Sequence, residues 1–356
     1  SVFAEKTAVV YGDRRYTYAE FGERVRRLAG GLAKLGLNPG DRVAFLCPNI
    51  PPMLEAHFGV PMAGGVLVAI NTRLATDEIV YIANHSGARF FFVDAELAKL
   101  IEPALDRLPG VEKYVRIVDA GFATNVPGPE YEEVLASGDG GTKVARGELD
   151  LLSINYTSGT TGQPKGVMYS HRGGYLNALS QVVHAGLAAD SNYLWTLPMF
   201  HCNGWCFTWG VTAVGATNVC LRKFDPEVAW QLVQGERVSH FCGAPTVLTM
   251  LAHHPAAASL ELPRPVRVLT GGAPPSPTII STMASLGVDV VHLYGLTETY
   301  GPNLLCEWQP AVDAMSSDDA ARFKARQGVP MVVTSGARVV DDDMQDVPDD
   351  GETIGE

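Results

Sequence analysis

The sequence has no cluster of lysine or arginine. Its 27 basic residues are outnumbered by 39 acidic residues, and the formal net charge is -12. Because binding to a nucleic-acid backbone requires clustered positive charge, this composition argues against a nucleic-acid partner. No apolar stretch reaches the roughly 18 residues that a transmembrane helix needs, and the N-terminus lacks the basic and apolar regions of a secretion signal. We therefore expect a cytoplasmic protein with no transmembrane segment.

Cysteine is also scarce, with six among 356 residues. The cysteines are Cys47, Cys202, Cys206, Cys220, Cys242 and Cys306. Most lie in apolar runs of a long chain, where free buried thiols are expected rather than a disulfide framework. His201, Cys202 and Cys206 have the residue types of a zinc site, but a second C-x2-C pair is lacking. The sequence therefore predicts no zinc site.

The chain is long enough for more than one hydrophobic core, with 356 residues of which 46% are hydrophobic. In its first third, short β-rich apolar runs at residues 42–47, 66–70, 89–93 and 114–118 alternate with amphipathic segments. This alternation is typical of βαβ units, in which helices pack onto a parallel sheet. The sequence therefore predicts an α/β fold with largely parallel sheets.

Local signals mark the ends of several elements. Thr17 and Glu20 have the spacing of a capping box at a helix N-terminus, and Gly36 supplies the stop. Asp225 and Pro226 are predicted as the N-cap and first residue of a helix. Further along, we expect strands at residues 239–242, 266–270 and 288–293, with a helix at 277–286.

A change of composition divides the chain. From residue 119 to 150, Gly, Pro, Asp and Glu replace the apolar runs, which indicates a surface connection. We therefore predict a first α/β subdomain at residues 1–150 and a second at residues 151–330. Residues 331–356 have the pattern of the start of a β-rich subdomain that is truncated where the chain ends.

The segment YTSGTTGQPKGV, residues 156–167, combines glycines, hydroxyl side chains and one lysine. Glycines allow backbone N–H groups to converge on an anion, hydroxyls donate hydrogen bonds to phosphate oxygens, and Lys165 can neutralise charge. The Walker A pattern is not met, because Lys165 follows a proline and no Ser or Thr follows it. The segment predicts a phosphate-binding loop; the alternative is a flexible linker.

Two further segments carry polar side chains suited to chemistry. LYGLTETYGP, residues 293–302, follows a predicted strand of an α/β sheet, and ligands bind at such strand ends. Its Glu298 is suited to magnesium, and the alternative is a turn with a solvated glutamate. In PMFHCNGWCFTWG, residues 198–210, His201, Trp205 and Trp209 lie in an apolar run. They predict either a pocket wall or an ordinary buried core.

These segments, in this order, resemble the motifs of the acyl-adenylate-forming superfamily, which includes acyl-CoA synthetases, non-ribosomal adenylation domains and firefly luciferase. YTSGTTGQPKGV is similar to the family's phosphate loop, and PMFHCNGW to its aromatic gate. GGAPP, residues 271–275, is similar to its adenine platform, and YGLTET to its magnesium and phosphate motif. GDRVAFLCPN, VAINTRL and YSHRG extend the resemblance over essentially the whole chain.

The resemblance implies roles for individual residues. Lys165, Thr297, Glu298 and His201 would be catalytic, with Lys165 at the β- and γ-phosphates and Thr157 and Glu298 at magnesium. The positions implied for ATP or AMP are Thr157, Ser158, Gly159, Thr160, Thr161, Gly162, Gly272, Ala273, Pro274, His292, Tyr294 and Gly295. The pocket for the acid would be lined by His201, Trp205, Gly271 and Gly301. His292 would meet the adenine amine, although histidine is not the residue expected there.

The implied fold is the large N-terminal domain of an adenylate-forming enzyme. The implied activity is that of an ATP-dependent acid–thiol ligase of fatty acid metabolism, with magnesium as cofactor. It forms acyl-AMP from a short- or medium-chain or small aromatic acid, releases pyrophosphate, and then forms acyl-CoA. The chain ends before the family's ribose-binding aspartate, its hinge and its C-terminal lid, so the fragment alone is expected to lack full activity. A homodimer is an expectation of the resemblance only.

Other functions remain compatible with the same residues. An adenylating domain can load a carrier-protein thiol instead of CoA or, as in luciferase, oxidise its adenylate. A catalytically silent nucleotide-binding module is an alternative from another class. From the bulk of Trp205 and Trp209 we expect a closed pocket for the acid rather than a long tunnel.

Overall fold

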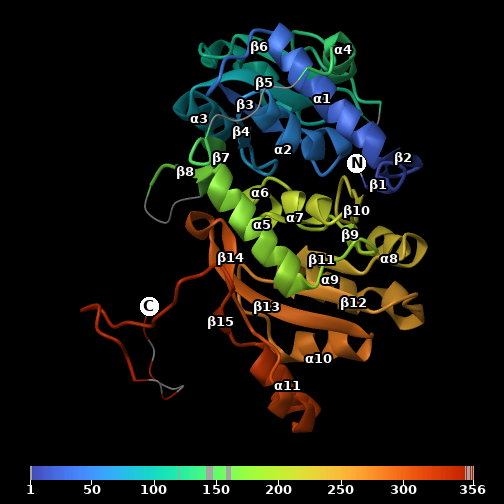
Figure 1. The fold of residues 1–356 in the computed structure, drawn as a ribbon, viewed down its shortest axis with the longest axis vertical. Helices are drawn as coiled ribbons and strands as arrows, with labels where there is room; N and C mark the ends of the chain where they lie inside the picture. The colour runs from blue at the N-terminus through green and yellow to red at the C-terminus, as the bar shows by residue number, and fades with distance from the viewer. Residues whose placement is uncertain are drawn as a thin grey trace.

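Two β-sheets, one above the other in the view of Figure 1, form the framework of the protein. The structure is a computed structural model, and it describes residues 2–119, 121–141, 147–157, 162–348, 350, 353 and 355. Within this part of the chain, the two sheets contain six and nine strands, and most neighbouring strands are parallel. The predicted α/β fold with largely parallel sheets is therefore confirmed.

The six-stranded sheet is built mainly by the first third of the chain. Its strands, in spatial order, are β6 (Lys113–Ile117), β5 (Ala88–Asp94), β3 (Arg42–Leu46), β4 (Val66–Ala69), β7 (Leu151–Thr157) and β8 (Lys165–Ser170). The helices that accompany it are α1 (Tyr18–Lys34), α2 (Pro51–Met62), α3 (Thr76–Ser86) and α4 (Tyr131–Ser137). Alternate strand residues bury opposite faces: Phe45 packs in the cluster that contains α1 and α2, and Ala44 in the cluster that contains α3.

The nine-stranded sheet carries most of the second half of the chain. In spatial order its strands are β15 (Val329–Pro330), β14 (Gly301–Leu305), β13 (Val288–Leu296), β12 (Val266–Thr270), β11 (His240–Gly243), β9 (Asn192–Leu194), β10 (Thr217–Val219), β1 (Thr7–Tyr11) and β2 (Arg14–Thr17). The remaining helices are α5 (His171–Ala185), α6 (Cys202–Trp205), α7 (Phe207–Ala213), α8 (Pro226–Gly235), α9 (Pro245–His253), α10 (Pro277–Ser285) and α11 (Ser317–Lys324). The largest hydrophobic cluster includes residues of both sheets, so the sheets share a core.

The local signals in the sequence specify the ends of the elements well. Thr17 and Glu20 form both hydrogen bonds of the capping box, and Gly36 follows the helix with a φ of 92°. Asp225 caps α8, and Pro226 is its first residue. The predicted strand at 266–270 matches β12, whereas the strand predicted at 288–293 continues as β13 to Leu296 because its end pairs with β14.

Sheet membership does not follow the linear division at residue 150. The N-terminal hairpin β1–β2 lies in the nine-stranded sheet, where Val9 pairs with Asn218. Conversely, β7 and β8 complete the six-stranded sheet through the parallel pairing of β7 with β4. The chain thus crosses between the sheets more than once, and the predicted subdomains at 1–150, 151–330 and 331–356 remain predictions.

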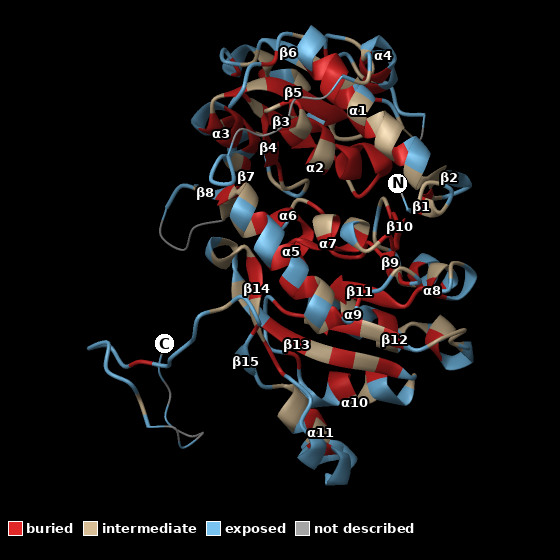
Figure 2. Cartoon of the chain, in the orientation of Figure 1, coloured by how far each residue is buried: buried red, intermediate tan, exposed pale blue. Residues whose placement is uncertain are grey.

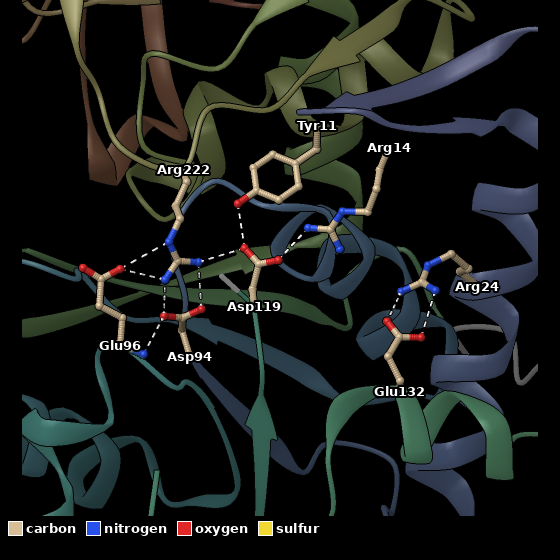
Figure 3. A network of polar contacts seen from close by, with 8 residues as sticks. All are labelled: Tyr11, Arg14, Arg24, Asp94, Glu96, Asp119, Glu132 and Arg222. Carbon is tan, nitrogen blue, oxygen red and sulfur yellow. Dashed lines mark hydrogen bonds and ion pairs between the residues drawn. The ribbon is translucent and has the colours of Figure 1, made fainter. Parts of the chain in front are cut away.

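A network of buried ion pairs connects the two sheets (Figure 3). Arg222, which follows β10, pairs with Asp94 at the end of β5 at 2.6 Å and with Asp119 at 3.1 Å. The hydroxyl of Tyr11 on β1 donates a 2.6 Å hydrogen bond to the same Asp119. Burial raises the pKa of Asp94, and the hydrogen bonds from Arg222 oppose that rise. The pairing therefore allows carboxylates to lie between the sheets with little access to water.

Buried residues concentrate in the strands of both sheets and in α2 (Figure 2). All six cysteines, each of them within the described residues, are buried and free of disulfides. Burial raises the pKa of every one of these thiols. Among the described residues, no helix combines the length and the apolar character that crossing a membrane would require.

Candidate active site

A cavity of about 370 Å³ opens where the two sheets meet. Its walls come from the end of β7, the start of β8, α6, the turn after β12 and the β13–β14 connection. The lining residues are Thr157, Lys165, His201, Cys202, Trp205, Gly271, Gly272, Leu293, Gly295, Leu296, Thr297, Glu298, Gly301 and Pro302. Segments from Thr157 to Pro302, which are 145 positions apart in the sequence (302 − 157), therefore contribute to one site.

Ten of the predicted site residues are brought together in this cavity. They are Thr157, Lys165, His201, Trp205, Gly271, Gly272, Gly295, Thr297, Glu298 and Gly301. Sequence reasoning missed Cys202, Leu293, Leu296 and Pro302 as wall residues. Each of them is adjacent in the sequence to a predicted site residue, and this adjacency was the available signal.

The hairpin β7–β8 presents the lysine of the predicted phosphate loop. Thr157 pairs with Lys165 in the antiparallel register, and Tyr156 pairs with Gly166. A side chain at position 166 would begin 2.9 Å from Ile154 and 3.1 Å from the ring of Tyr156, which explains the glycine. Ser158, Gly159, Thr160 and Thr161 lie outside the described residues. Gly162 is described and exposed, and it does not line the cavity.

The acidic turn Thr297–Thr299, labelled η4, is held against β8 and α5. The Tyr169 hydroxyl donates a 2.6 Å hydrogen bond to the main-chain oxygen of Thr297. The ring of Tyr300 stacks on Tyr169, with ring centroids 4.1 Å apart, and its hydroxyl accepts a hydrogen bond from the Ser170 N–H. The turn that carries Glu298 is therefore fixed to the strand that begins with Lys165.

A glycine makes this stacking possible. A Cβ at Gly173 would lie 2.2 Å from the Tyr300 ring, so the glycine of YSHRG leaves room for that ring. Tyr300 itself adopts a left-handed conformation with φ 65°. The Asn177 amide donates to the carbonyls of Thr299 and Tyr300, both at 3.3 Å. These contacts stabilise a backbone conformation that a non-glycine residue adopts only at some cost.

Lys165 and Glu298 line the cavity without a charged partner among the described residues. Both are exposed and line the same cavity. An ammonium and a carboxylate that face one cavity without being paired are suited to a ligand that carries phosphate and a divalent cation. No cluster of three or more His, Cys, Asp or Glu residues that could hold a metal occurs in the ranges that the structure describes, this cavity included.

The segment HCNGWC forms a short left-handed turn. Successive φ values from Cys202 to Cys206 are 48°, 45°, 60°, 54° and 62°. A left-handed helical conformation costs roughly 1–2 kcal/mol per residue for an L-amino acid other than glycine. Such strain persists only where surrounding contacts enforce it, and it is common at functional sites. This turn places Cys202 and Trp205 in the cavity wall.

His201 and Cys202 enter the cavity as neutral groups near pH 7. Burial and the positive charge of Arg73 lower the pKa of His201, although part of its side chain faces solvent at the cavity mouth. Burial raises the pKa of Cys202 to about 11, and its sulfur lies 3.4 Å from the Thr297 hydroxyl. Because a thiolate would be the reactive form, Cys202 serves here as a wall residue.

The other residues implied for nucleotide binding lie beside the cavity. Ala273 and Pro274 are exposed next to Gly272, and Tyr294 is 43% exposed on β13. His292 is buried, and its Nδ1–H donates to the carbonyls of Ala325 and Arg326 at 2.9 Å. Neither His292 nor Tyr294 is part of the cavity wall. Their contacts with adenine stay predictions.

Known proteins share this sequence and this fold. The family model described as AMP-binding enzyme matches residues 1–356. The chain is 42% identical to 4-hydroxybutyrate–CoA ligase 2 of Metallosphaera sedula, over 99% of this chain and 65% of that protein. It is 41% identical to an acetate–CoA ligase of Humulus lupulus, over 100% of this chain and 66% of that protein. The chain thus spans slightly less than two thirds of the length of these curated relatives.

Solved structures agree with the sequence relatives. The N-terminal domain of FACL13 from Mycobacterium tuberculosis, solved with an inhibitor, matches with a TM-score of 0.85 and 30% identity. That match covers 97% of this chain and 83% of the other. An anthranilate CoA ligase in complex with anthranoyl-AMP has the same fold, with a TM-score of 0.85 at 23% identity. On the family model, the sequence relatives and the shared fold, the chain belongs to the AMP-binding enzyme family.

Proposed function

We propose that the protein activates a small carboxylic acid with ATP as an acyl-AMP and then transfers the acyl group to coenzyme A. The observation that supports this best is the convergence of two distant segments on one cavity. Lys165 comes from the β7–β8 hairpin, and Glu298 comes from the turn after β13. Both line the cavity, and neither is paired with another charge in the described residues. The acyl-adenylate chemistry uses both charges.

The first step overcomes the poor reactivity of a carboxylate. A carboxylate oxygen of the acid attacks the α-phosphorus of ATP, the bond to the bridging oxygen breaks, and pyrophosphate leaves. Lys165 is placed to neutralise the negative charge that develops on the leaving phosphates. The hydroxyls of Thr157 and Thr297 are placed to donate hydrogen bonds to phosphate oxygens. In the second step the CoA thiol loses its proton and its sulfur attacks the acyl carbon, the bond between that carbon and the phosphate oxygen breaks, and AMP leaves.

The donor set fits magnesium as the associated cation. Glu298 offers a carboxylate, and Thr157 and Thr297 offer hydroxyls, which are the hard oxygen ligands that Mg²⁺ prefers. When bound there, the ion would supply charge neutralisation at the phosphates. Soft ligands are poorly represented in the wall, because the Cys202 thiol stays protonated.

The shape of the cavity favours a small acid. Trp205 is 5% exposed, and its indole reaches towards Gly271: a Cβ at residue 271 would lie 3.4 Å from the end of the ring. The indole therefore closes one side of a cavity of about 370 Å³. Relatives are named for acetate, butyrate, 4-hydroxybutyrate and 2-methylpropanoate, and one is named for trans-cinnamate. We infer a short- or medium-chain or small aromatic acid as the substrate of this protein.

The direct test supplies the full-length protein with ATP, magnesium and CoA and with acids from acetate to palmitate, together with benzoate and cinnamate. We expect acyl-CoA and stoichiometric AMP from the shorter acids of this series and little product from palmitate, because the Trp205 indole limits the length of the acid pocket. Acyl-AMP without thioester would instead favour a carrier protein as acceptor. ATP binding without AMP formation would leave only a silent nucleotide-binding module and would refute the proposal.

The oligomeric state and the cellular location of the protein stay predictions. A homodimer is consistent with the family but has no interface assigned in the chain. A cytoplasmic location is our expectation for this protein, while four relatives from plants carry names that place them in peroxisomes.

A further inference from the structure

A buried polar cluster holds the left-handed turn of Cys202–Cys206 against strand β7. The side-chain oxygen of Asn203 accepts a hydrogen bond from the Asn155 amide and another from the Ser153 hydroxyl, both at 2.6 Å. In return, the Asn203 N–H donates to the Asn155 side-chain oxygen at 3.1 Å. The turn is thus fixed to the strand both through its side chain and through its backbone.

The cluster lies entirely inside the protein. Asn203 and Ser153 have no exposed surface, and Asn155 is 2% exposed. The Asn203 amide nitrogen has no hydrogen-bond partner among the described residues, so the side chain is oriented by the bonds that its oxygen accepts. Because buried polar groups are costly to leave unpaired, these bonds strongly favour one position of the turn.

The position of the turn determines the position of the Trp205 indole. A Cβ at Gly301 would lie 3.3 Å from the Trp205 Cα, and a Cβ at Gly271 would lie 3.4 Å from the far end of the ring. The indole therefore extends across the cavity between these two glycines. On the other side, a Cβ at Gly204 would lie 2.6 Å from Trp195, which leaves the turn no room to move inwards.

We propose that Asn155 and Asn203 are positioning residues that set the depth of the acid pocket. Neither side chain lines the cavity, and they act by holding the turn that carries Trp205. The proposal rests on the proposed function, because it assigns the Trp205 side of the cavity to the acid. β7 ends at Thr157, so the strand that fixes this wall also leads into the predicted phosphate loop.

The geometry makes a specific prediction for selectivity. Without the hydrogen bonds, the left-handed turn loses the contacts that enforce its conformation, and Trp205 can move away from Gly271. A deeper pocket accepts a longer acid. A single methylene in an apolar pocket changes kcat/KM by roughly 10- to 200-fold, so a modest displacement of the indole is measurable.

The experiment compares two acids in the full-length protein: the best acid of the series and the linear acid two carbons longer. The readout is the ratio of their kcat/KM values, which does not depend on the fraction of folded enzyme. Two variants remove the contacts, Asn155→Ala and Asn203→Gly. Glycine at position 203 tolerates the φ of 45°, so that variant deletes the amide without adding backbone strain. Asn192→Ala, which loses a hydrogen bond to the Glu236 carbonyl far from the cavity, is the control.

We expect the ratio to shift towards the longer acid by at least about fivefold in both variants and to stay within about twofold in Asn192→Ala. If Asn155→Ala does not fold, Ser153→Ala is used in its place, because it also removes one of the two hydrogen-bond donors to the Asn203 side-chain oxygen. The proposal is overturned if the ratio of kcat/KM values is unchanged both in the β7 variant and in Asn203→Gly. It is also overturned if Asn192→Ala changes the ratio equally. Failure of the parent protein to form any acyl-AMP is a different result, since it would refute the proposed function itself.

Discussion

The Tyr169 hydroxyl donates a 2.6 Å hydrogen bond to the main-chain oxygen of Thr297, and so connects the lysine-bearing strand to the acidic turn. Burial raises the pKa of Tyr169 far above its ordinary value, so the hydroxyl remains a donor at any working pH. The bond joins residues 128 positions apart. It therefore fixes the turn that carries Glu298 to the strand that begins with Lys165.

This contact can be removed without changing the ring. Tyr169→Phe keeps the stacking on Tyr300 but deletes the donor to Thr297. A buried hydrogen bond contributes about 1 kcal/mol, so we expect pyrophosphate exchange to slow by roughly threefold to tenfold. The control is Tyr175→Phe, because Tyr175 is 64% exposed on α5. Equal rates in the two variants would contradict a role for the Tyr169 bond.

Replacement of Trp205 tests whether the indole closes the acid pocket. Trp205→Ala should extend the accepted acids by several carbons, because it empties the space between Gly271 and Gly301. It should also lower the free energy of unfolding by about 3–5 kcal/mol, as for other buried aromatic residues. Trp209→Ala serves as the control, since Trp209 does not line the cavity and its Nε1–H donates to the His57 carbonyl. If the range of acid chain lengths that the enzyme accepts is unchanged in Trp205→Ala, the acid does not bind against the Trp205 indole.

The pH dependence should report on His201. Burial and the charge of Arg73 lower the pKa of His201 below its ordinary value of 6.5, so the ring is neutral above that pH and gains a proton only below it. A protonated ring would pair with the substrate carboxylate and hold it away from the phosphate. We therefore expect kcat/KM for the acid to fall on the acidic side of pH 6.5, measured as initial rates across pH.

Removal of Arg73 provides the check on this assignment. In Arg73→Ala the repulsion that disfavours the imidazolium is lost, so the pKa of His201 should rise and the acidic limb should move to higher pH. A limb that stays in place in Arg73→Ala, and that also persists in His201→Phe, must belong to another group.

The ion network between the sheets should dominate the stability of their junction. Arg222 pairs with the fully buried Asp94, and its loss leaves Asp94 and Asp119 without their shared cation. We expect Arg222→Met to lower the free energy of unfolding by about 3–5 kcal/mol, measured by urea denaturation. Arg26→Met removes a solvent-exposed pair with Glu23 on α1 and should cost less than about 1 kcal/mol. Similar losses in both variants would show that the network adds nothing beyond a surface pair.

Local patterns in the sequence predicted the elements whose ends are set locally. The capping box at Thr17, the cap at Asp225 and the strand Val266–Thr270 all depend on side chains within a few residues. The motifs likewise predicted most of the cavity wall, because the phosphate-loop motif and YGLTET carry their polar residues at the ends of β7, β8 and β13. The pairing of Val9 with Asn218 could not be predicted, since no local signal selects a partner strand about 210 residues away.

The left-handed turn is the clearest case of a feature that the sequence left hidden. Asn203-Gly204 is a residue pair that tolerates positive φ, but Cys202, Trp205 and Cys206 have no such preference. Their conformation depends on Asn155 and Ser153, which lie about 50 residues earlier in the chain. Tertiary contacts thus override the local preference at the point where the pocket is formed.

The measurement that tests the central claim most directly is acid-dependent exchange of pyrophosphate into ATP, made in the full-length protein with Lys165→Ala and Glu298→Ala. Each charge should contribute about 3–4 kcal/mol to the transition state, so exchange should fall by roughly a hundredfold to a thousandfold in each variant. Lys113→Ala, an exposed lysine on β6, should match the parent protein. Undiminished exchange in both site variants would contradict the claim that these two segments act on one triphosphate.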